Sequence, residues 1–486
     1  MKRFASALLT VFAVMIATLG VRTAVFPSRQ IDVPPALALK LDHESIGKRL
    51  SAAIQVPTVS SDSATAADSA RIAEFHKLLV AFFPRVHAQL SREIVNDYSL
   101  LYTWTGNDSR LKPILLVAHM DVVPVDSAGE KSWTYPPFSG QLTDGYIWGR
   151  GAMDDKASLL GILEAVESLL TEGFQPQRTI YLAFGHDEEI GGYNGAAKIA
   201  STLAARHVQL DYVLDEGMNI LSGIIDGIAA PVALIGIAEK GYLSIELDAE
   251  AAGGHSSVPP ADRAIASVSR ALQRLEATPF SAKIQGPTRA MFDFLGPEMA
   301  WTKKLVLANL WLFEPLVAHR LSQSPLTNAI IRTTLAPTMF NSGVKDNVLP
   351  THARAVINLR IMPGESTASA LQRVRRTIED SKIKLTPLAN RLEPSAVSDF
   401  DSRSFKLLAR TIREIMPQAI VAPALLVAAS DSRHYAGLTK EVWRFLPLTI
   451  TAGDVNRYHG VDERISLTDY LRCINFYGQL IKNSSN

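Results

Sequence analysis

The segment T-I-Y-L-A-F-G-H-D-E-E-I-G-G (residues 179–192) decides how the rest of this chain is interpreted. Its first half is an apolar run that predicts a buried strand. Its second half places three consecutive carboxylates, Asp187, Glu188 and Glu189, directly after that strand. Grouping like charges is unfavourable unless solvent or a bound cation offsets their repulsion. The segment therefore predicts a strand whose carboxyl end carries a metal site, with a solvated loop as the alternative.

Further strands and a helix surround this segment along the chain. The apolar runs at residues 113–118 and 211–214 predict two more buried strands, and residues 156–172 carry apolar side chains at helical spacing. Strands that alternate with helices predict an α/β fold with a mostly parallel sheet and helices on both faces. In such sheets ligands bind beyond the carboxyl ends of the strands. The chemistry is expected at that edge.

The pattern changes at about residue 240. Residues 242–249 and 353–361 alternate apolar and polar side chains, as half-exposed antiparallel strands do. We expect these two segments to pair in a smaller α+β domain that is inserted into the first and acts as a lid or a dimerisation surface. The predicted division is residues 41–239 and 363–486 for the catalytic domain and 240–362 for the insertion.

Composition limits the possible functions. Apolar residues make up 47% of the 486 residues and charged residues 20%, so the chain can bury a large core. Lysine and arginine total 49 against 48 aspartate and glutamate, which argues against nucleic acid as the main partner. The single cysteine, Cys473, excludes an intrachain disulfide and a thiolate metal cluster. Any metal must therefore be held by histidine and carboxylate side chains.

The N-terminal residues 1–24 contain an uncharged stretch, residues 4–21, between Arg3 and Arg22. Eighteen helical residues span about 27 Å, close to the hydrocarbon thickness of a bilayer. We expect an uncleaved membrane anchor whose basic N-terminal end stays cytoplasmic, with the catalytic part outside, in the periplasm or the extracellular space. A cleaved signal peptide and a buried core helix are the alternatives. Residues 25–40 contain three prolines and are predicted to be a linker.

Four other polar clusters follow predicted strands or precede a helix. Taken singly, each has an ordinary structural explanation; Asp154, for example, precedes a helix and suits an N-cap. Together they bring histidines and several carboxylates to one edge of one sheet. Zinc accepts such nitrogen and oxygen ligands, and two zinc ions need a bridging carboxylate and a separate general base. The clusters are H-M-D-V-V-P (residues 119–124), G-R-G-A-M-D-D-K (149–156), D-E-G (215–217) and Y-H-G-V-D-E-R (458–464).

With D-E-E-I-G-G and G-G-H-S-S-V-P-P (residues 253–260), these motifs make the chain, from about residue 40 to its end, resemble the dizinc aminoacylase and carboxypeptidase metallopeptidases. The run S-D-S-R-H-Y (430–435) and the long insertion are similar to the branch of carboxypeptidase S and the secreted N-acyl-amino-acid hydrolases. The resemblance implies two Zn²⁺ ions and a cis peptide bond between Asp154 and Asp155. The implied metal ligands are His119, Asp154, Glu189, His459 and either Asp215 or Glu216.

The resemblance also implies roles for residues that do not bind metal. Glu188 would be the general base that activates a water bridging the two ions, and Asp121 would orient His119. His255 would polarise the scissile carbonyl, from the partner subunit in dimeric relatives. Arg433, with Asn347 and Arg360, would hold the substrate carboxylate, a task suited to a guanidinium fork.

The implied activity is hydrolysis of an amide or peptide bond next to a free carboxylate. The substrate would be a small peptide or an N-acyl amino acid, and the apolar residues 305–317 favour the acyl substrate unless they are ordinary core. A dipeptidase with different end specificity and a noncatalytic, metal-stabilised binding protein are the alternatives. Three further expectations concern partners. The chain could form a homodimer, it is expected to attach to a membrane through the N-terminal segment, and it is not expected to bind nucleic acid.

Overall fold

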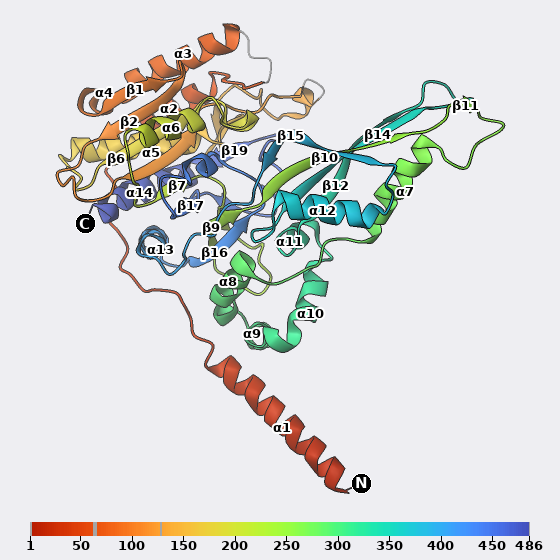
Figure 1. The fold of residues 1–486 in the computed structure, drawn as a ribbon. Coiled ribbons are helices and arrows are strands. Elements are labelled where there is room, and N and C mark those ends of the chain that lie inside the picture. Colours follow the sequence, from red (N-terminus) through yellow and green to blue (C-terminus); the bar gives the residue numbers. More distant parts are fainter. Residues whose placement is uncertain (1, 62–65, 127–128, 486) are drawn as a thin grey trace.

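Residues 2–61, 66–126 and 129–485 are described by a computed structural model of the chain, shown in Figure 1. A ten-stranded sheet forms the larger layer, and the strands at its centre, β6, β3, β7 and β17, run parallel. This confirms the expected α/β class. The strands in sheet order are β1 (Ser91–Val95), β2 (Ser99–Trp104), β6 (Ile180–Gly185), β3 (Ile114–His119), β7 (Val213–Asp215), β17 (Val442–Arg444), β9 (Val232–Glu239), β8 (Ile220–Leu221) and β18 (Thr449–Ile450), with β16 (Ile420–Leu426) paired to β9.

Both faces of this sheet are covered by helices, because its central strands are apolar on both sides. Along β3, Leu116 packs into a core shared with α5 and α14, whereas Leu115 and Val117 pack into a second core with α6. Side chains that alternate between two buried faces explain why residues 113–118 form a continuous apolar run. The helices around the sheet are α2 (His43–Ile54), α3 (Ala66–Phe82), α4 (Pro84–Gln89), α5 (Lys156–Thr171), α6 (Ala196–Ala205), α13 (Arg403–Ile415) and α14 (Leu467–Ser484).

A second, four-stranded antiparallel sheet extends from the larger one (Figure 1). The expected pairing of residues 242–249 with 353–361 is confirmed, with Leu247 opposite Ala355. This sheet continues past residue 362, since residues 363–392 add a helix and an edge strand to the same apolar core. The strand order is β12 (Thr334–Ser342), β14 (His352–Ile361), β10 (Gly241–Glu250) and β15 (Lys384–Leu392), covered by α7 (Ala264–Ala277) and α12 (Thr367–Ile378).

Smaller elements complete the chain. Residues 286–329 form helices around a small apolar cluster of their own, so the apolar residues 291–321 are helical, and the first of these helices also packs against β16. They are α8 (Gly286–Leu295), η3 (Gly296–Glu298), α9 (Trp301–Ala308), α10 (Leu310–Leu321) and α11 (Pro325–Ala329). The others are the two-stranded sheet of β11 (Gly254–His255) and β13 (Val348–Leu349), the three-stranded sheet of β19 (Arg464–Ser466), β5 (Tyr146–Trp148) and β4 (Gln141–Thr143), and the short helices η1 (Glu130–Ser132), η2 (Glu188–Ile190) and η4 (Asp431–Tyr435).

Helix α1 (Lys2–Ala24) projects away from the rest of the molecule (Figure 1). Residues 3–24 are long and apolar enough to cross a membrane, with a mean hydropathy of 2.3 in a window of which none is buried. The residues that follow α1 lie extended along the part of the protein that contains the ten-stranded sheet. The backbone of Val421 exchanges hydrogen bonds with the side chain of Gln30, and Ala36 N–H donates to the carbonyl of Glu414 at 2.9 Å. The segment predicted to be a linker is therefore held against the protein.

We expect a change at His76 in α3 to alter how stability depends on pH. Burial lowers the pKa of His76 from its ordinary 6.5 to about 4, so the unfolded chain binds a proton in a range where the folded chain does not. The free energy of unfolding therefore falls as the pH is lowered through this range. The urea midpoint of His76→Gln should fall less steeply than that of the unchanged chain between about pH 6.5 and pH 4. The exposed His43→Gln is the control, and equal slopes for H76Q and the unchanged chain would contradict the prediction.

Candidate active site

The parallel strands bring the predicted polar residues to one edge of the larger sheet. Strand β3 ends at His119 and β7 ends at Asp215, while η2, with Glu188 and Glu189, follows β6 after two residues. The N–H of Met120 donates to the carbonyl of Gly185 at 2.8 Å, which aligns the ends of β3 and β6. Residues that are far apart in the sequence thus meet because parallel neighbours finish at the same edge.

The carboxylate of Asp154 lies between two imidazoles. Its Oδ1 is 3.0 Å from Nε2 of His119, and its Oδ2 is 3.1 Å from Nε2 of His459. Asp155 takes the N-cap position of α5, so the side chain of Asp154 is not used as a cap. The Asp154–Asp155 peptide bond is cis, as expected.

The donor arrangement around His119 requires positive charge between the imidazole and Asp154. Nδ1 of His119 is 2.9 Å from the carbonyl of Asp121 and therefore carries a hydrogen. Nε2 then either presents a lone pair to the carboxylate, which is repulsive, or holds a cation or a second proton. In the absence of a cation, the hydrogen bonds with Asp121 and Asp154 overcome burial and raise the pKa of His119 well above its ordinary value. This donor set fits a metal ion.

Two groups of side chains have ligand atoms close enough to share one ion. His119, Asp154 and Glu216 form the first group and Asp154, Glu189 and His459 the second, each with atoms within 4.8 Å of one another. In the second group, Nε2 of His459 is 3.2 Å from Glu189, and hydrogen bonds with Asp154 and Glu189 raise the pKa of His459 to about 10. Oε1 of Glu189 is buried without a hydrogen-bond partner in the described part of the chain. Asp154 belongs to both groups.

The carboxylate of Asp215 makes hydrogen bonds that differ from the contacts of its neighbour Glu216. Its carboxylate accepts hydrogen bonds from the N–H groups of Glu216 at 2.9 Å and Ser432 at 2.6 Å. Those contacts fix the end of β7 against η4. Of the two adjacent carboxylates that the sequence left undecided, Glu216 is the one that lies beside His119 and Asp154.

Asp121 connects the imidazole of His119 to the turn that carries the two glutamates. Its carboxylate lies 3.4 Å from Nδ1 of His119 and is almost fully buried. The same carboxylate accepts hydrogen bonds from the N–H groups of Glu188 and Glu189, each at 3.1 Å. Asp121 thus contacts both His119 and the backbone of η2, and its role in orienting His119 stays a prediction.

Glu463 supports the site and was not singled out from the sequence. Its buried carboxylate accepts hydrogen bonds from the N–H groups of Gly151, Met153 and Asp154 at 2.8–3.2 Å, and Arg150 pairs with it at 2.7 Å. These bonds hold the loop that presents Asp154. The only signal in the sequence was its place in the motif Y-H-G-V-D-E-R.

Glu188 lies in a strongly acidic, buried environment. Burial raises its pKa well above the ordinary value, and the charges of Asp431 and Glu189 act in the same direction. Asp431 is fully enclosed, and neither of its carboxylate oxygens has a hydrogen-bond partner among the described residues. Gly192, with φ of 66°, makes room for it, because a Cβ there would lie 1.9 Å from Asp431 Oδ1. Asp431 is a second buried carboxylate that the sequence did not single out.

A cavity of about 730 Å³ opens at the carboxylate cluster. Asp154, Glu188, Glu189, Glu216 and His459 line it together with Arg360 and Arg433. Arg433 donates to the carbonyl of Gly191 at 2.8 Å, and its Nε is buried without a partner among the described residues. The guanidinium of Arg360 lies over the ring of Tyr242 at 4.9 Å. Neither arginine forms an ion pair within the described residues, so both have donors available to an anion.

His255 and Asn347 lie outside this cavity. Both are exposed at the two-stranded β11–β13 sheet, at the far end of the second sheet (Figure 1), where Ser256 N–H donates to the carbonyl of Asn347 at 3.1 Å. Nδ1 of His255 contacts the hydroxyl of Ser257 at 2.8 Å. The two residues are near each other but do not join the other site residues within the chain.

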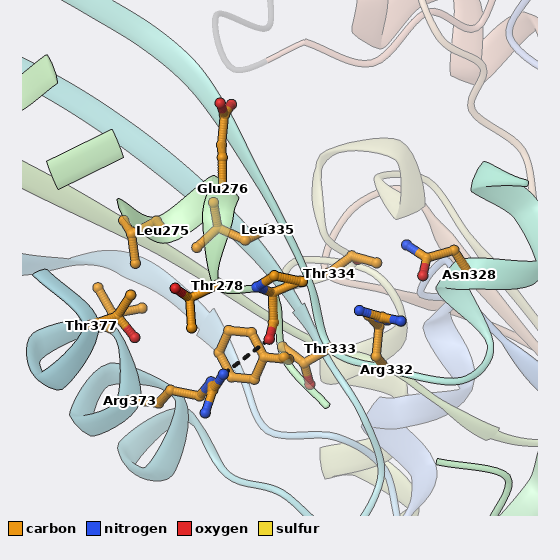
Figure 2. A pocket seen from close by; sticks show the side chains of 13 residues that line it. Leu275, Glu276, Thr278, Asn328, Arg332, Thr333, Thr334, Leu335, Arg373 and Thr377 are labelled. Carbon is orange, nitrogen blue, oxygen red and sulfur yellow. Dashed lines mark hydrogen bonds between the residues drawn. The ribbon is translucent and has the colours of Figure 1, made fainter. Parts of the chain in front are cut away.

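Figure 2 shows a second, smaller cavity beside the four-stranded sheet and its helices. Its volume is about 200 Å³. Arg332 and Arg373 line it among threonine and apolar side chains, and Arg373 donates to the carbonyl of Pro279. Glu276 is the sole carboxylate among its described lining residues. It lacks the histidine and grouped carboxylates of the larger cavity, which remains the candidate active site.

Comparison with known proteins agrees with this geometry. Residues 115–483 match the family described as Peptidase family M20/M25/M40. This chain belongs to that family. The metallopeptidase resemblance of the motifs is thereby confirmed, and the family's chemistry is metal-dependent hydrolysis of amide or peptide bonds.

The relatives of this M20-family enzyme come from the expected branch. The probable carboxypeptidase S-like 2 of Dictyostelium discoideum is 45% identical over 413 residues, which cover 85% of this chain and 79% of that protein. The N-fatty-acyl-amino acid synthase/hydrolase PM20D1.1 of Danio rerio is 42% identical over 437 residues, covering 89% and 84%. The M20 metallo-carboxypeptidase Sso-CP2 of Sulfolobus solfataricus has the same fold, with a TM-score of 0.66 at 16% identity, over 92% of this chain and 100% of that one.

Proposed function

We propose that this enzyme hydrolyses the amide bond of N-acyl amino acids with two zinc ions held on either side of Asp154. The observation that carries the proposal is the position of Asp154, whose two oxygens face Nε2 of His119 and Nε2 of His459 at 3.0 and 3.1 Å. A carboxylate shared by two ligand groups is what a pair of ions 3.5–4 Å apart requires.

The residues divide into two ligand sets. His119, Asp154 and Glu216 would hold one ion, and Asp154, Glu189 and His459 the other. Glu216 is preferred to Asp215, because the oxygens of Asp215 already accept two backbone hydrogen bonds. When bound, the ions would supply electrophilic polarisation of the carbonyl and lower the pKa of a water molecule.

Glu188 acts as the general base in this proposal. It lines the cavity but belongs to neither ligand set, so its carboxylate is free to exchange protons. Its buried, acidic surroundings make it a stronger proton acceptor than an exposed glutamate once it is ionised. Glu188 takes a proton from the attacking water and passes it to the leaving nitrogen.

Substrate selection rests on the charged and apolar residues that line one cavity. Arg433 and Arg360 would hold the free carboxylate, since a guanidinium offers two parallel donors. Leu392, Leu426 and Ala428 line the same cavity and give the acyl chain an apolar surface. The relative named N-fatty-acyl-amino acid synthase/hydrolase supports an acyl substrate, whereas the carboxypeptidase S-like relative supports a peptide as the second candidate.

Replacing the proposed general base Glu188 should lower turnover and leave metal binding unchanged. We expect Glu188→Gln to retain its zinc, measured by elemental analysis, and to lose about 10²–10⁴-fold in kcat on N-acyl-leucine. Release of leucine from N-acyl-leucine should also exceed release from Gly-Leu and should stop when a chelator is added. The exposed Glu44→Gln in α2 is the matched control. Full turnover by E188Q at normal zinc content would remove Glu188 from this role, and faster release from Gly-Leu would make the enzyme a dipeptidase or carboxypeptidase.

Removing the guanidinium of Arg433 should affect substrates that carry a free carboxylate. A charge-assisted hydrogen-bonded pair is lost, so kcat/KM of Arg433→Ala on N-acyl-leucine should fall about 10–100-fold, mainly through KM. N-acyl-leucinamide, which has no carboxylate, should be hydrolysed equally well by both forms. An equal loss on the amide would contradict the assignment.

His255 and Asn347 would serve the site of a second subunit in a homodimer. They lie together at the exposed two-stranded β11–β13 sheet, away from the cavity that holds the other site residues. A two-fold arrangement would let each β11–β13 sheet reach the partner's cavity, so that each site is complete only in the dimer. There His255 would polarise the scissile carbonyl and Asn347 would assist in binding the carboxylate.

Mixing two inactive variants tests the exchange of His255. A dimer of His255→Ala and Glu188→Gln chains has one site in which both residues are intact. Random mixing should therefore restore about a quarter of the activity of the unchanged enzyme, measured after subunit exchange. Variants that stay inactive although exchange is demonstrated by mass would contradict the trans arrangement.

We also propose that α1 is retained as an uncleaved anchor that holds the catalytic part outside the cytoplasm. No residue of its 18-residue apolar window is buried in the protein, which leaves that surface available to lipid. In contrast, Thr23 in its last turn is buried against the folded protein, a contact that a cleaved signal peptide would lose.

A further inference from the structure

The helices α9 and α10 present an apolar surface to solvent. Trp301 and Trp311 are 55% and 57% exposed, and Leu312 and Leu316 are 39% and 61% exposed. Large side chains at this exposure lose favourable free energy by remaining in water, and grouped on one helical pair they indicate an interaction site. None of them lines the cavity at the carboxylate cluster, so the active site does not account for them.

The last turn of α1 packs on the junction between these two helices. The buried Asn309 donates from Nδ2 to the carbonyl of Leu19 and to Oγ1 of Thr23, both at 3.3 Å. Arg22 donates to the carbonyl of Ala308 at 3.4 Å. Figure 1 shows α9 and α10 at the same end of the molecule from which α1 projects. The exposed apolar surface therefore lies beside the point where the membrane-spanning candidate ends.

The residues after α1 hold this arrangement in place. Phe26 packs into the small core of α8–α10, where it approaches Gly296 closely. The guanidinium of Arg29 lies over the ring of Phe294 at 5.0 Å. Gln30 then bonds to the edge of β16 through the backbone of Val421. The helix and the folded protein are thus joined by short-range contacts, and inserting α1 into a bilayer would bring α9 and α10 to its surface.

We propose that the α9–α10 surface is seated in the interfacial layer of the lipid bilayer next to α1. Tryptophan side chains concentrate in this layer, because they combine an apolar ring with a polar N–H. Leu312 and Leu316 would enter the acyl region, and the basic Lys304 on α9 and Arg320 on α10 would meet lipid phosphates. The inference rests on the proposed role of α1 as an anchor. It adds a second contact, which holds the enzyme flat on the membrane instead of on a mobile tether.

Spin labelling of the full chain in vesicles tests this contact. The single native cysteine, Cys473, is buried, so a label on Leu316→Cys reports from α10 alone. The control is Ile94→Cys, whose side chain is 53% exposed. Ile94 belongs to β1, a strand that lies far from α10 (Figure 1). In phosphatidylcholine–phosphatidylglycerol vesicles, we expect dissolved oxygen to relax the label at position 316 more than a water-soluble nickel chelate does. At position 94 the order should be reversed.

The outcomes separate the possible occupants of the surface. Equal, water-like accessibility at positions 316 and 94 in chains retained by the vesicles would overturn the membrane contact while leaving the anchor intact. Dipolar coupling between labels at position 316 would show that a second copy covers the surface, and would also overturn it. Chains that wash off the vesicles would overturn the anchor and the contact together. Trp301→Cys repeats the test from α9, and hydrolysis of N-acyl-leucine shows that each variant is folded.

Discussion

The concentration of buried negative charge around Asp154 is the constraint on which the rest of this molecule depends. Glu188, Glu189 and Glu216 line the same cavity as Asp154. Charges of one sign at such distances are strongly unfavourable without an offsetting cation. Two imidazoles supply part of the compensation through hydrogen bonds, and a metal pair would supply the remainder. Folding and metal binding are therefore expected to be coupled.

The fold meets this constraint by fixing the proposed ligands with a surrounding layer of hydrogen bonds. Asp121 binds the backbone of the turn that carries Glu188 and Glu189, and Glu463 binds the loop that carries Asp154. Asp215 joins β7 to η4 in the same way. Each of these carboxylates accepts backbone N–H groups, which leaves the metal-facing side chains free. Such supporting contacts restrict the ligand atoms to one geometry before any ion binds.

Two other parts of the chain, the β11–β13 sheet and the N-terminal helix α1, lie away from this site. The two-stranded β11–β13 sheet lies at the far end of the second sheet, away from the cavity (Figure 1). On the other side, α1 and α9 are held together through the buried Asn309.

Most of the proposed site was readable from residue types and order, because each proposed ligand follows a strand end or precedes a helix in a short motif. Apolar runs predicted the strands, and histidines beside carboxylates predicted metal-dependent chemistry. The three-dimensional structure was needed to find that Glu216, and not Asp215, lies beside His119 and Asp154, since adjacent residues at the end of a strand point in opposite directions. The three-dimensional structure was also needed to place Asp431 and Glu463 at the proposed site and residues 25–40 against the folded protein. The sequence did not predict these placements, because long-range contacts leave no periodic signal in the chain.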